Sequence, residues 1–408
     1  MQTHLPAKLL ETPQGKEADR ILRSCVHCGF CTATCPTFLV TGNELDSPRG
    51  RIYLIKEVLE TGRATQITRT HLDRCLSCQA CETTCPSDVN YHSLLNIGRE
   101  VIAQVSPEKS GAKLKRILLL SILGSQHVFR FLVKLGQTFR KFLPKSLSSQ
   151  LPGKSLFSAQ DYVPKKNKRK VVLLDGCVQS SLSPDTSRAT TVVLNRLGIE
   201  ALHISPESCC GAMTFHSNQQ TKGLNKAKLL IDQIIKELDD GAEAVISTAS
   251  GCGNFIKDYS SIFKNDNEYQ SKAGRVVDVV SDISEFLLQE DLSKLKSSAG
   301  HRLAFHSPCT LQHGQQLGGV TESVLEQLGF TIPAIKNSHL CCGSAGTYSI
   351  FQPEMAKELG RNKIESLQET ECESIATANI GCQCHLAGLG KKTVRHWIEF
   401  VAQSNISV

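Results

Sequence analysis

Apolar residues recur every three or four positions in the first part of the chain. Residues 52–60 show this period most clearly, with apolar side chains at 52, 54, 55, 58 and 59. The spacing predicts an amphipathic helix. Ser47 or Asp46, followed by Pro48, is a start signal for that helix, and Gly62 is a stop signal. The helices expected in this part cover residues 16–24, 52–60, 71–74 and 91–105.

From residue 168 onwards, short apolar runs alternate with helical segments. Strands that alternate with helices of this length predict mostly parallel sheets. The fold class is therefore α+β overall, with an α-helical first part and an α/β second part. The expected strands cover residues 169–177, 201–205, 244–248, 301–306 and 374–378. The expected helices cover residues 190–197, 223–238, 320–328 and 353–367.

A basic segment separates the two patterns. Between residues 109 and 160 the chain has no Asp or Glu but ten Lys or Arg. Residues 113–123 and 128–142 are basic and apolar at helical spacing, and residues 146–170 form a linker rich in Ser, Pro and Lys. Helices of this composition lie in membrane interfaces, but helices that pack on a partner protein have the same pattern. Both interpretations make the segment a docking surface.

Composition limits the class of protein. The 408 residues are 40% hydrophobic, which is enough for two or three domains with real cores. The net charge of +7 is modest, and we expect no nucleic-acid partner. The N-terminal residues lack the features of a signal peptide, and the longest apolar run, 117–123, is far shorter than the roughly 20 residues of a membrane span. We therefore expect a cytoplasmic protein that is peripheral on the inner face of the cell membrane.

Two cysteine motifs carry the strongest chemical signal. Residues 25–36 and 75–86 both read C-x2-C-x2-C-x3-C-P. This spacing is typical of [4Fe–4S] clusters, and the fourth cysteine of each run ligates the other cluster in two-cluster ferredoxins. A zinc site would leave the third cysteine of each run without a role, and disulfides would need an oxidising compartment. One expected ligand set is Cys25, Cys28, Cys31 and Cys85, and the other is Cys75, Cys78, Cys81 and Cys35.

A second cysteine system repeats within the α/β part. In each copy, thirty-one residues separate a single cysteine from a Cys-Cys-Gly sequence, and a further cysteine follows after the next predicted strand. These residues are candidate metal ligands or redox thiols, and the alternative is that they are small buried apolar residues. Four of them follow predicted strands, so we expect them at the carboxyl ends of the sheet. The candidates are Cys177, Cys209, Cys210 and Cys252 in the first copy, and Cys309, Cys341, Cys342, Cys382 and Cys384 in the second.

The chain lacks the usual signatures of an organic cofactor. Neither the dinucleotide sequence G-x-G-x-x-G nor the phosphate-binding sequence G-x4-G-K-[ST] occurs in its glycine-bearing loops. We therefore expect no flavin or NAD on this chain. Two clusters without such a site indicate an electron carrier whose substrate is oxidised on another subunit.

These motifs resemble known families. The helical segment between the two four-cysteine motifs resembles the α-helical ferredoxin domain of succinate dehydrogenase iron–sulfur subunits. The Cys-Cys-Gly repeat resembles the cysteine-rich domain of heterodisulfide reductases. The chain as a whole resembles the glycolate oxidase iron–sulfur subunit family, through both cysteine motifs, Asp46-Ser-Pro-Arg-Gly-Arg51, His306-Ser-Pro-Cys309 and Cys341-Cys-Gly-Ser-Ala-Gly346.

The resemblance implies a division of the chain and a role for each part. It implies two [4Fe–4S] clusters, flavoprotein partner subunits that oxidise glycolate, and electron transfer towards the quinone pool at the membrane surface. Related complexes that act on lactate or glycerol-3-phosphate, or a heterodisulfide reductase-like catalytic subunit, are the alternatives. The expected parts are a ferredoxin domain at 1–105, the basic docking segment and linker at 106–168, and cysteine-rich copies at 169–290 and 300–408.

Two features stay open at this stage. Arg49 and Arg51 either donate hydrogen bonds to the clusters or are solvated charges at a helix start. The cysteine-rich copies end in Cys252 alone and in Cys382-Gln-Cys384, not in the C-x2-C of heterodisulfide reductase. Its noncubane cluster is thus in question here, and either a further cubane cluster or an empty site remains.

Overall fold

The computed structural model describes residues 1–408 except 108–109, 145–147, 159–161, 205–207, 297–299 and 405–408. The expected end of a strand at 205 and parts of the expected linker and docking segment thus lie outside the described residues. The chain folds into two compact units. Unit 1 contains Met1–Leu118, His216–Asn218 and His339–Lys363, and unit 2 contains Leu119–Phe215, Gln219–Ser338 and Ile364–Val408.

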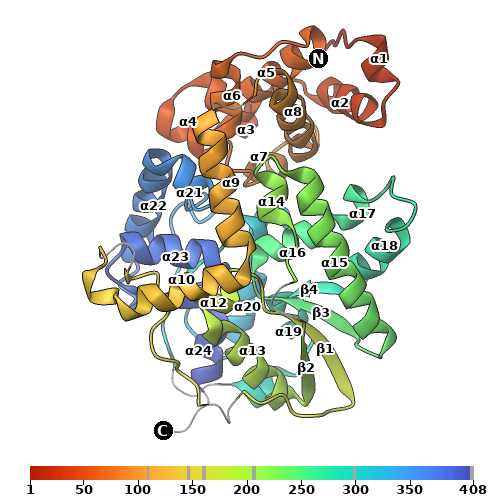
Figure 1. The fold of residues 1–408 in the computed structure, drawn as a ribbon. Coiled ribbons are helices and arrows are strands. Elements are labelled where there is room, and N and C mark those ends of the chain that lie inside the picture. The colour runs from red at the N-terminus through yellow and green to blue at the C-terminus, as the bar shows by residue number, and fades with distance from the viewer. Residues whose placement is uncertain (108–109, 145–147, 159–161, 205–207, 297–299, 405–408) are drawn as a thin grey trace. The chain divides into compact units, whose positions relative to one another are not determined.

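Unit 1 is built from helices around one apolar core. The long helix α8 packs on both α2 and α5 (Figure 1). Leu22, Ile55 and Leu94, one from each of these helices, are buried in this core. Short helices between them carry the cysteine motifs. The elements are α1 (Ala7–Leu10), α2 (Pro13–Ser24), α3 (Phe30–Ala33), α4 (Pro36–Thr41), η1 (Glu44–Asp46), α5 (Pro48–Thr61), α6 (Gln66–Asp73), α7 (Ala80–Thr83), α8 (Tyr91–Val105) and α21 (Tyr348–Phe351).

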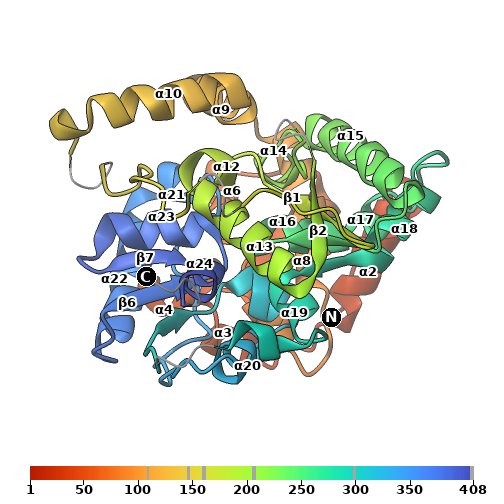
Figure 2. The same ribbon diagram turned by 90° about the horizontal axis from the view of Figure 1, so that it is seen from below.

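The first sheet of unit 2 has four parallel strands in the order β2-β1-β3-β4. Alternate residues of β1 face different cores, since Val171 and Leu173 pack on one side and Val172 on the other. Helices α13 and α15 therefore cover opposite faces, as Figures 1 and 2 show. The elements are β1 (Arg169–Leu174), α12 (Gln179–Leu182), α13 (Pro184–Leu197), β2 (Ile199–His203), α14 (Ala212–His216), α15 (Gln220–Asp239), β3 (Ala244–Ser247), α16 (Ser250–Lys257), α17 (Tyr259–Ile262), α18 (Gln270–Val279), β4 (Val280–Asp282), α19 (Ile283–Leu287) and η3 (Leu292–Leu295).

The second sheet of unit 2 has three parallel strands in the order β5-β6-β7. Its core is shared with one face of the first sheet and includes the fully buried Trp397. The elements are β5 (Ala304–His306), η4 (Thr310–Gly314), α20 (Val320–Gln327), β6 (Ser374–Thr377), α23 (Ile380–Leu389), β7 (Thr393–His396) and α24 (Trp397–Gln403). Helix α22 (Pro353–Gln368) begins in unit 1 and ends in unit 2.

The basic segment forms α9 (Ser110–Gly124), α10 (Gln126–Thr138) and η2 (Arg140–Phe142). Among the described residues, no single helix has the length and hydropathy of a membrane span. Helices α9 and α10 meet that criterion only as a pair, and they are bent by 88° at the break between them.

The α+β class, the helical first part and the parallel sheets are confirmed, and the expected helix at 91–105 is α8 (Tyr91–Val105). The cysteine-rich copies contribute to two sheets, although their pattern predicted one shared edge. Strands β4 and β7 were missed because each has only three or four residues and runs directly into a helix. Helix α6 begins before the expected residue 71 because Thr65 and Thr68 form a capping box.

Candidate metal centres

The two four-cysteine motifs fold into matching loops. In the loop 25–31, His27 and Gly29 have positive φ angles of 58° and 86°. The equivalent residues of the second motif, Ser77 and Gln79, have φ angles of 52° and 60°. Alternating left-handed residues curl each backbone tightly. The first three cysteines of a motif can therefore face one common space.

The fourth cysteine of each motif leaves that loop. Cys35 is the N-cap of α4, and Pro36 occupies the first helical position, where its missing N–H costs nothing. Cys85 follows α7, and Pro86 comes directly after it. Each of these two cysteines is therefore directed by a separate short helix.

Two cavities bring the eight cysteines together in two groups. One, of about 400 Å³, is bordered by Cys35, Cys75, Cys78 and Cys81. The other, of about 440 Å³, is bordered by Cys25, Cys28, Cys31 and Cys85, and also touches Cys81. Each cavity therefore has three cysteines from one motif and the fourth from the other. This is the grouping on which the predicted ligand sets depend.

The two cavities adjoin each other. Pro48, Cys81 and Tyr91 border both of them. The Tyr91 hydroxyl also lies 3.7 Å from the Cys75 sulfur, as a donor to it. Sequence reasoning gave Tyr91 no role, since a tyrosine at the start of a helix carries no metal signature. Centres in these cavities would be separated by little more than these side chains.

The donor set fits iron–sulfur clusters. Thiolates are the ligands that such clusters use. Burial raises the pKa of the Cys31 thiol to about 11 and that of Cys81 well above its usual range. Both thiols are thus protonated at neutral pH until a metal displaces the proton.

A buried polar network fixes Cys35. Its sulfur lies 3.5 Å from the carbonyl oxygen of Asp46, 3.3 Å from the Thr37 hydroxyl and 3.9 Å from Nη1 of Arg51. Arg51 is 1% exposed, and it also donates to Thr37 and to the carbonyl of His71. The interpretation of Arg51 as a solvated charge is therefore wrong.

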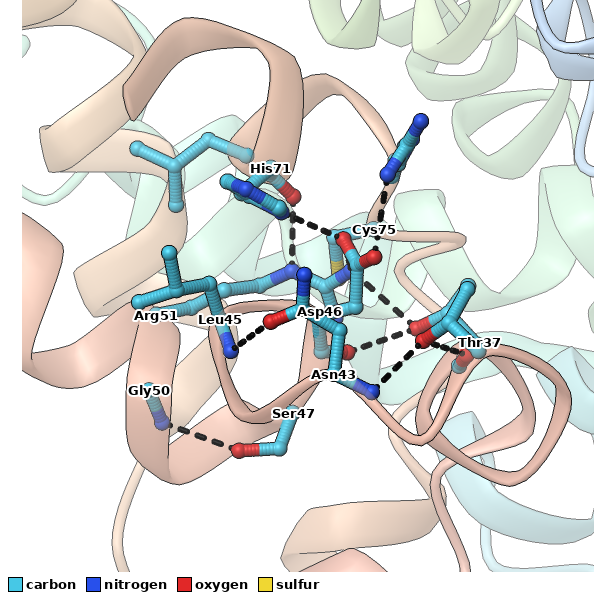
Figure 3. Close-up of polar contacts among 12 residues, drawn as sticks. Thr37, Asn43, Leu45, Asp46, Ser47, Gly50, Arg51, His71 and Cys75 are labelled. Atoms are coloured by element: carbon cyan, nitrogen blue, oxygen red, sulfur yellow. Dashed lines mark hydrogen bonds and ion pairs between the residues drawn. The ribbon is translucent and has the colours of Figure 1, made fainter. Parts of the chain in front are cut away.

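The carboxylate of Asp46 is the centre of this network (Figure 3). It is fully buried and pairs with His71 Nδ1 at 2.8 Å, Arg74 Nη1 at 3.1 Å and Arg51 Nη2 at 3.5 Å. Because Arg74 directly precedes Cys75, the network ties the end of one motif to the start of the other. Sequence reasoning missed the roles of Asp46 and His71, although Asp46 lies within a quoted family sequence.

Arg49 has a different environment. Its side chain is about one-third exposed, and Nε lies 2.7 Å from a carboxylate oxygen of Glu44. It borders the cavity of Cys25, Cys28 and Cys31. The two arginines therefore face different cavities, and only Arg51 is buried.

The first cysteine-rich copy forms a separate site within unit 2. Cys177 follows β1, and Cys252 lies in α16 after β3. Together with Cys210 they border a cavity of about 390 Å³ at the carboxyl ends of these neighbouring strands. The chain reverses its direction of travel across the sheet between β1 and β3, which is where open α/β sheets place their ligands.

The thiols of this copy are strongly coupled. The sulfurs of Cys177 and Cys209 are in hydrogen-bond contact at 3.5 Å, and the backbone N–H of Gly211 donates to the Cys209 sulfur at 3.4 Å. Hydrogen bonds from Cys177 and Cys210 lower the pKa of Cys209, and the hydrogen bond with Cys209 raises the pKa of Cys177. Cys209 is therefore the most acidic thiol of this group, which suits a soft metal or redox chemistry.

The cysteines of the second copy are divided between the units. Cys309 follows β5 and Cys382 lies in α23, with its sulfur within 4.8 Å of a ring nitrogen of His306. Cys384 is on the same helix but borders another cavity of unit 2, of about 910 Å³, together with Arg395 and Glu399. Burial raises the pKa of the Cys384 thiol to about 12.

Cys341 and Cys342 are buried in the segment 339–363 of unit 1. In the same unit, the hydroxyl of Tyr348 donates to the carbonyl of Arg74 at 3.0 Å. Burial, and the nearby Cys75 and Cys341, raise the pKa of Tyr348. The second Cys-Cys-Gly loop therefore lies near the entrance to the second ferredoxin motif.

Three segments of the chain match known protein families. Residues 21–89 match the 4Fe-4S dicluster domain family, and residues 171–257 and 303–387 each match the cysteine-rich domain family. The chain is 48% identical to the glycolate oxidase iron-sulfur subunit of Escherichia coli (strain K12) over 404 residues, which cover 99% of both chains. The chain belongs to the glycolate oxidase iron–sulfur subunit family.

The chain is also similar to more distant proteins. The probable glycolate oxidase iron-sulfur subunit of Bacillus subtilis (strain 168) is 29% identical over 390 residues, which cover 88% of this chain and 87% of that one. Lactate utilization protein A of a Geobacillus species (strain WCH70) is 26% identical over 230 residues, which cover 55% of this chain and 92% of that one. The predicted family is confirmed, and with it the chain's role as an iron–sulfur component of an oxidoreductase complex that carries [4Fe–4S] clusters.

Proposed function

We propose that this chain is the electron-transfer subunit of a membrane-associated flavoprotein glycolate dehydrogenase. Flavin-bearing partner subunits oxidise glycolate to glyoxylate, which releases two electrons and two protons. The chain passes the electrons on singly towards membrane quinone, which takes up two electrons and two protons per quinol. The observation that carries the proposal is the pair of adjoining cavities, one bordered by four cysteines and the other by five, with Cys81 on both.

The ligand sets are part of the proposal. Cys25, Cys28, Cys31 and Cys85 hold one [4Fe–4S] cluster, and Cys35, Cys75, Cys78 and Cys81 hold the other. A bound cluster supplies one-electron transfer. The chain provides the thiolates, excludes water with the apolar walls of unit 1, and places the Arg51 guanidinium beside Cys35. That positive charge favours the reduced state of the neighbouring centre.

The two cysteine-rich copies provide further cysteine ligands. We assign Cys177, Cys209, Cys210 and Cys252 of the first copy to a further iron–sulfur site, because a cavity, a shared thiol proton and a sheet edge coincide there. The Tyr348 hydroxyl donates a hydrogen bond to the carbonyl of Arg74, the residue before Cys75. This contact supports an electron-transfer path from the ferredoxin region towards Cys341 and Cys342. The proposal keeps the division of the chain into a ferredoxin domain at 1–105, a docking segment and linker at 106–168, and cysteine-rich copies at 169–290 and 300–408.

A second candidate function follows from the lowered pKa of the Cys209 thiol. In that case the first copy would perform thiol or disulfide chemistry itself, as a heterodisulfide reductase-like catalytic subunit. The lowered pKa of Cys209 between two protonated thiols favours this possibility. Substitution of Cys209 by Ser would then abolish turnover while the iron content remained unchanged.

The test uses the complex purified anaerobically with its partner subunits. Glycolate should reduce the clusters of the intact complex, as followed by low-temperature EPR, while the separated chain should show no glycolate-dependent dye reduction. Glycolate oxidation by the flavin-free chain would refute the proposal.

The crossed ligand sets have their own test in the same material. Cys35→Ser should alter the EPR signal that Cys78→Ser alters, and Cys85→Ser should alter the signal that Cys28→Ser alters. If Cys35→Ser and Cys28→Ser change the same signal, the ligand sets are wrong.

A further inference from the structure

Helix α10 and the turn η2 expose an apolar stripe that faces away from the core of unit 2. Val128, Phe131, Leu132 and Leu135 share one side of α10 at about 100° per residue, and Phe139 and Phe142 follow in its C-cap and in η2. Phe131 is 65% exposed and Phe142 is 86% exposed. The stripe consists of Val128, Phe131, Leu132, Leu135, Phe139 and Phe142, each at least 41% exposed.

The opposite side of α10 attaches the helix to unit 2. Gln126 and Val133 are buried, and Nε2 of Gln126 donates to the Ser180 hydroxyl of α12 at 2.9 Å. Nε2 of Gln137 donates to the carbonyl of Pro152 at 3.0 Å. An amphipathic helix of a water-soluble domain directs its apolar side inwards, whereas α10 buries a mixed side and exposes the apolar one.

Charge is also distributed unevenly around α10. Arg130 and Lys134 are exposed and lie on one flank of the apolar stripe, at helix angles between those of the buried and the apolar sides, and the exposed Lys141 follows in η2. No acidic residue occurs anywhere between residues 109 and 160. The surface therefore presents Phe and Leu together with positive charge alone.

We propose that this stripe and its basic flank form a docking surface for an anionic lipid bilayer, with α10 lying in the plane of the interface. The apolar stripe enters the boundary between headgroups and acyl chains, and the basic flank contacts lipid phosphates. A protein partner would be expected to meet a patch poor in Lys and mixed in sign. The inference rests on the proposed function, since it specifies how the membrane-associated chain reaches its membrane.

Basic charge and apolar insertion each contribute to the affinity for the vesicles. Each Lys or Arg near an anionic surface strengthens binding about fivefold, so neutralising Arg130, Lys134 and Lys141 should weaken it about 100-fold. Each Phe moved from water into the interface contributes roughly a further tenfold. The triple substitution Phe131→Ser, Phe139→Ser and Phe142→Ser should therefore abolish measurable binding.

Flotation of the anaerobically prepared full-length chain with vesicles tests the proposal. The chain should bind vesicles of phosphatidylglycerol and phosphatidylcholine, bind phosphatidylcholine alone weakly, and dissociate as salt is raised. Leu229→Ser on α15, whose side chain is 66% exposed, is the matched control and should bind like the wild type. Wild-type binding by the triple Phe variant, with its cluster absorbance intact, would overturn the proposal.

A fluorescent reporter checks insertion directly. The chain has one Trp, the fully buried Trp397, so Phe131→Trp adds a single exposed reporter. Its emission should be quenched by lipids brominated on the acyl chains, while Leu229→Trp should not be affected. An unquenched Phe131→Trp would place the stripe outside the bilayer and contradict the proposal.

The complex separates this inference from the proposed function. Glycolate-dependent reduction of a water-soluble dye should persist in the triple Phe variant, since it needs no membrane. Loss of the partner subunits from that variant would show that a protein covers the stripe and would overturn the lipid assignment. Loss of dye reduction in the wild-type complex would instead refute the proposed function and leave vesicle binding as a separate result.

Discussion

Arg51 offers the sharpest test of how the fold controls the centre at Cys35. Its guanidinium is 1% exposed, and Nη1 lies 3.9 Å from the Cys35 sulfur. Arg51→Met keeps most of the side-chain volume but removes the charge and three hydrogen bonds, to Cys35, Thr37 and the carbonyl of His71. Both the reduction potential of the centre and the stability of unit 1 should fall.

The size of the effect can be worked out from the distances. A unit charge 3.9 Å from the sulfur interacts with it by about 4 kcal/mol at an effective dielectric constant of about 20. The Asp46 carboxylate, 3.5 Å from Arg51, carries the opposite charge and opposes this interaction. The remaining 1–2 kcal/mol, roughly, corresponds to a midpoint potential lowered by about 40–90 mV. Removal of one partner from the buried charge network should cost about 3–5 kcal/mol of unfolding free energy.

EPR-monitored redox titration of the anaerobic chain measures the potentials of both centres. Arg51→Met should lower one midpoint potential, and Arg51→Lys should restore part of it. Arg49→Met is the matched control, because Arg49 is partly exposed, is paired with Glu44 and borders the other cavity. If Arg51→Met leaves both potentials unchanged in a folded chain, or lowers both equally, the reasoning about Cys35 is wrong.

Two further substitutions test the packing of unit 2. Burial raises the pKa of Glu399 to about 7 from its ordinary value of 4.5, so the folded state holds this proton more tightly and unfolding free energy should fall as pH rises between these values. Urea unfolding across that pH range should show a smaller decline in Glu399→Gln, with a gain of up to about 3 kcal/mol at pH 8, and an equal decline would contradict the assignment. Gly211 has a φ of 88°, and a Cβ there would lie 2.3 Å from the Gly223 carbonyl oxygen. Gly211→Ala should therefore lower the thermal midpoint of unfolding by several degrees. Gly241 has a φ of 95° but nothing within 4 Å of a Cβ, so Gly241→Ala should lower that midpoint less. Equal shifts in these two glycine variants would show that the close approach of Gly211 is unimportant.

Sequence periodicity and cysteine spacing predicted the main features well. Helix α8 and the strands β1 and β6 were predictable because their apolar patterns are long or sharply bounded. The short strand β7 was not, since its four residues pass directly into α24. Local patterns carry too little information to distinguish such a strand from the start of a helix.

Some residues of the candidate sites could also be predicted from the sequence, and others could not. The eight ferredoxin cysteines were identifiable because a thiol spacing of this kind has few other uses. Asp46, His71 and Tyr91 were not, because their roles arise only when segments distant in sequence meet. The outward direction of the α10 stripe was also undecided, since an amphipathic pattern predicts an apolar side but not what covers it.

Iron and acid-labile sulfide analysis of the anaerobically purified chain tests the central claim most directly. Two cubane clusters predict at least about eight iron and eight sulfide per chain, with about half of the ferredoxin iron lost in Cys31→Ser. A chain that binds zinc in place of iron, or that contains fewer than about four iron per molecule when protected from oxygen, would contradict the account.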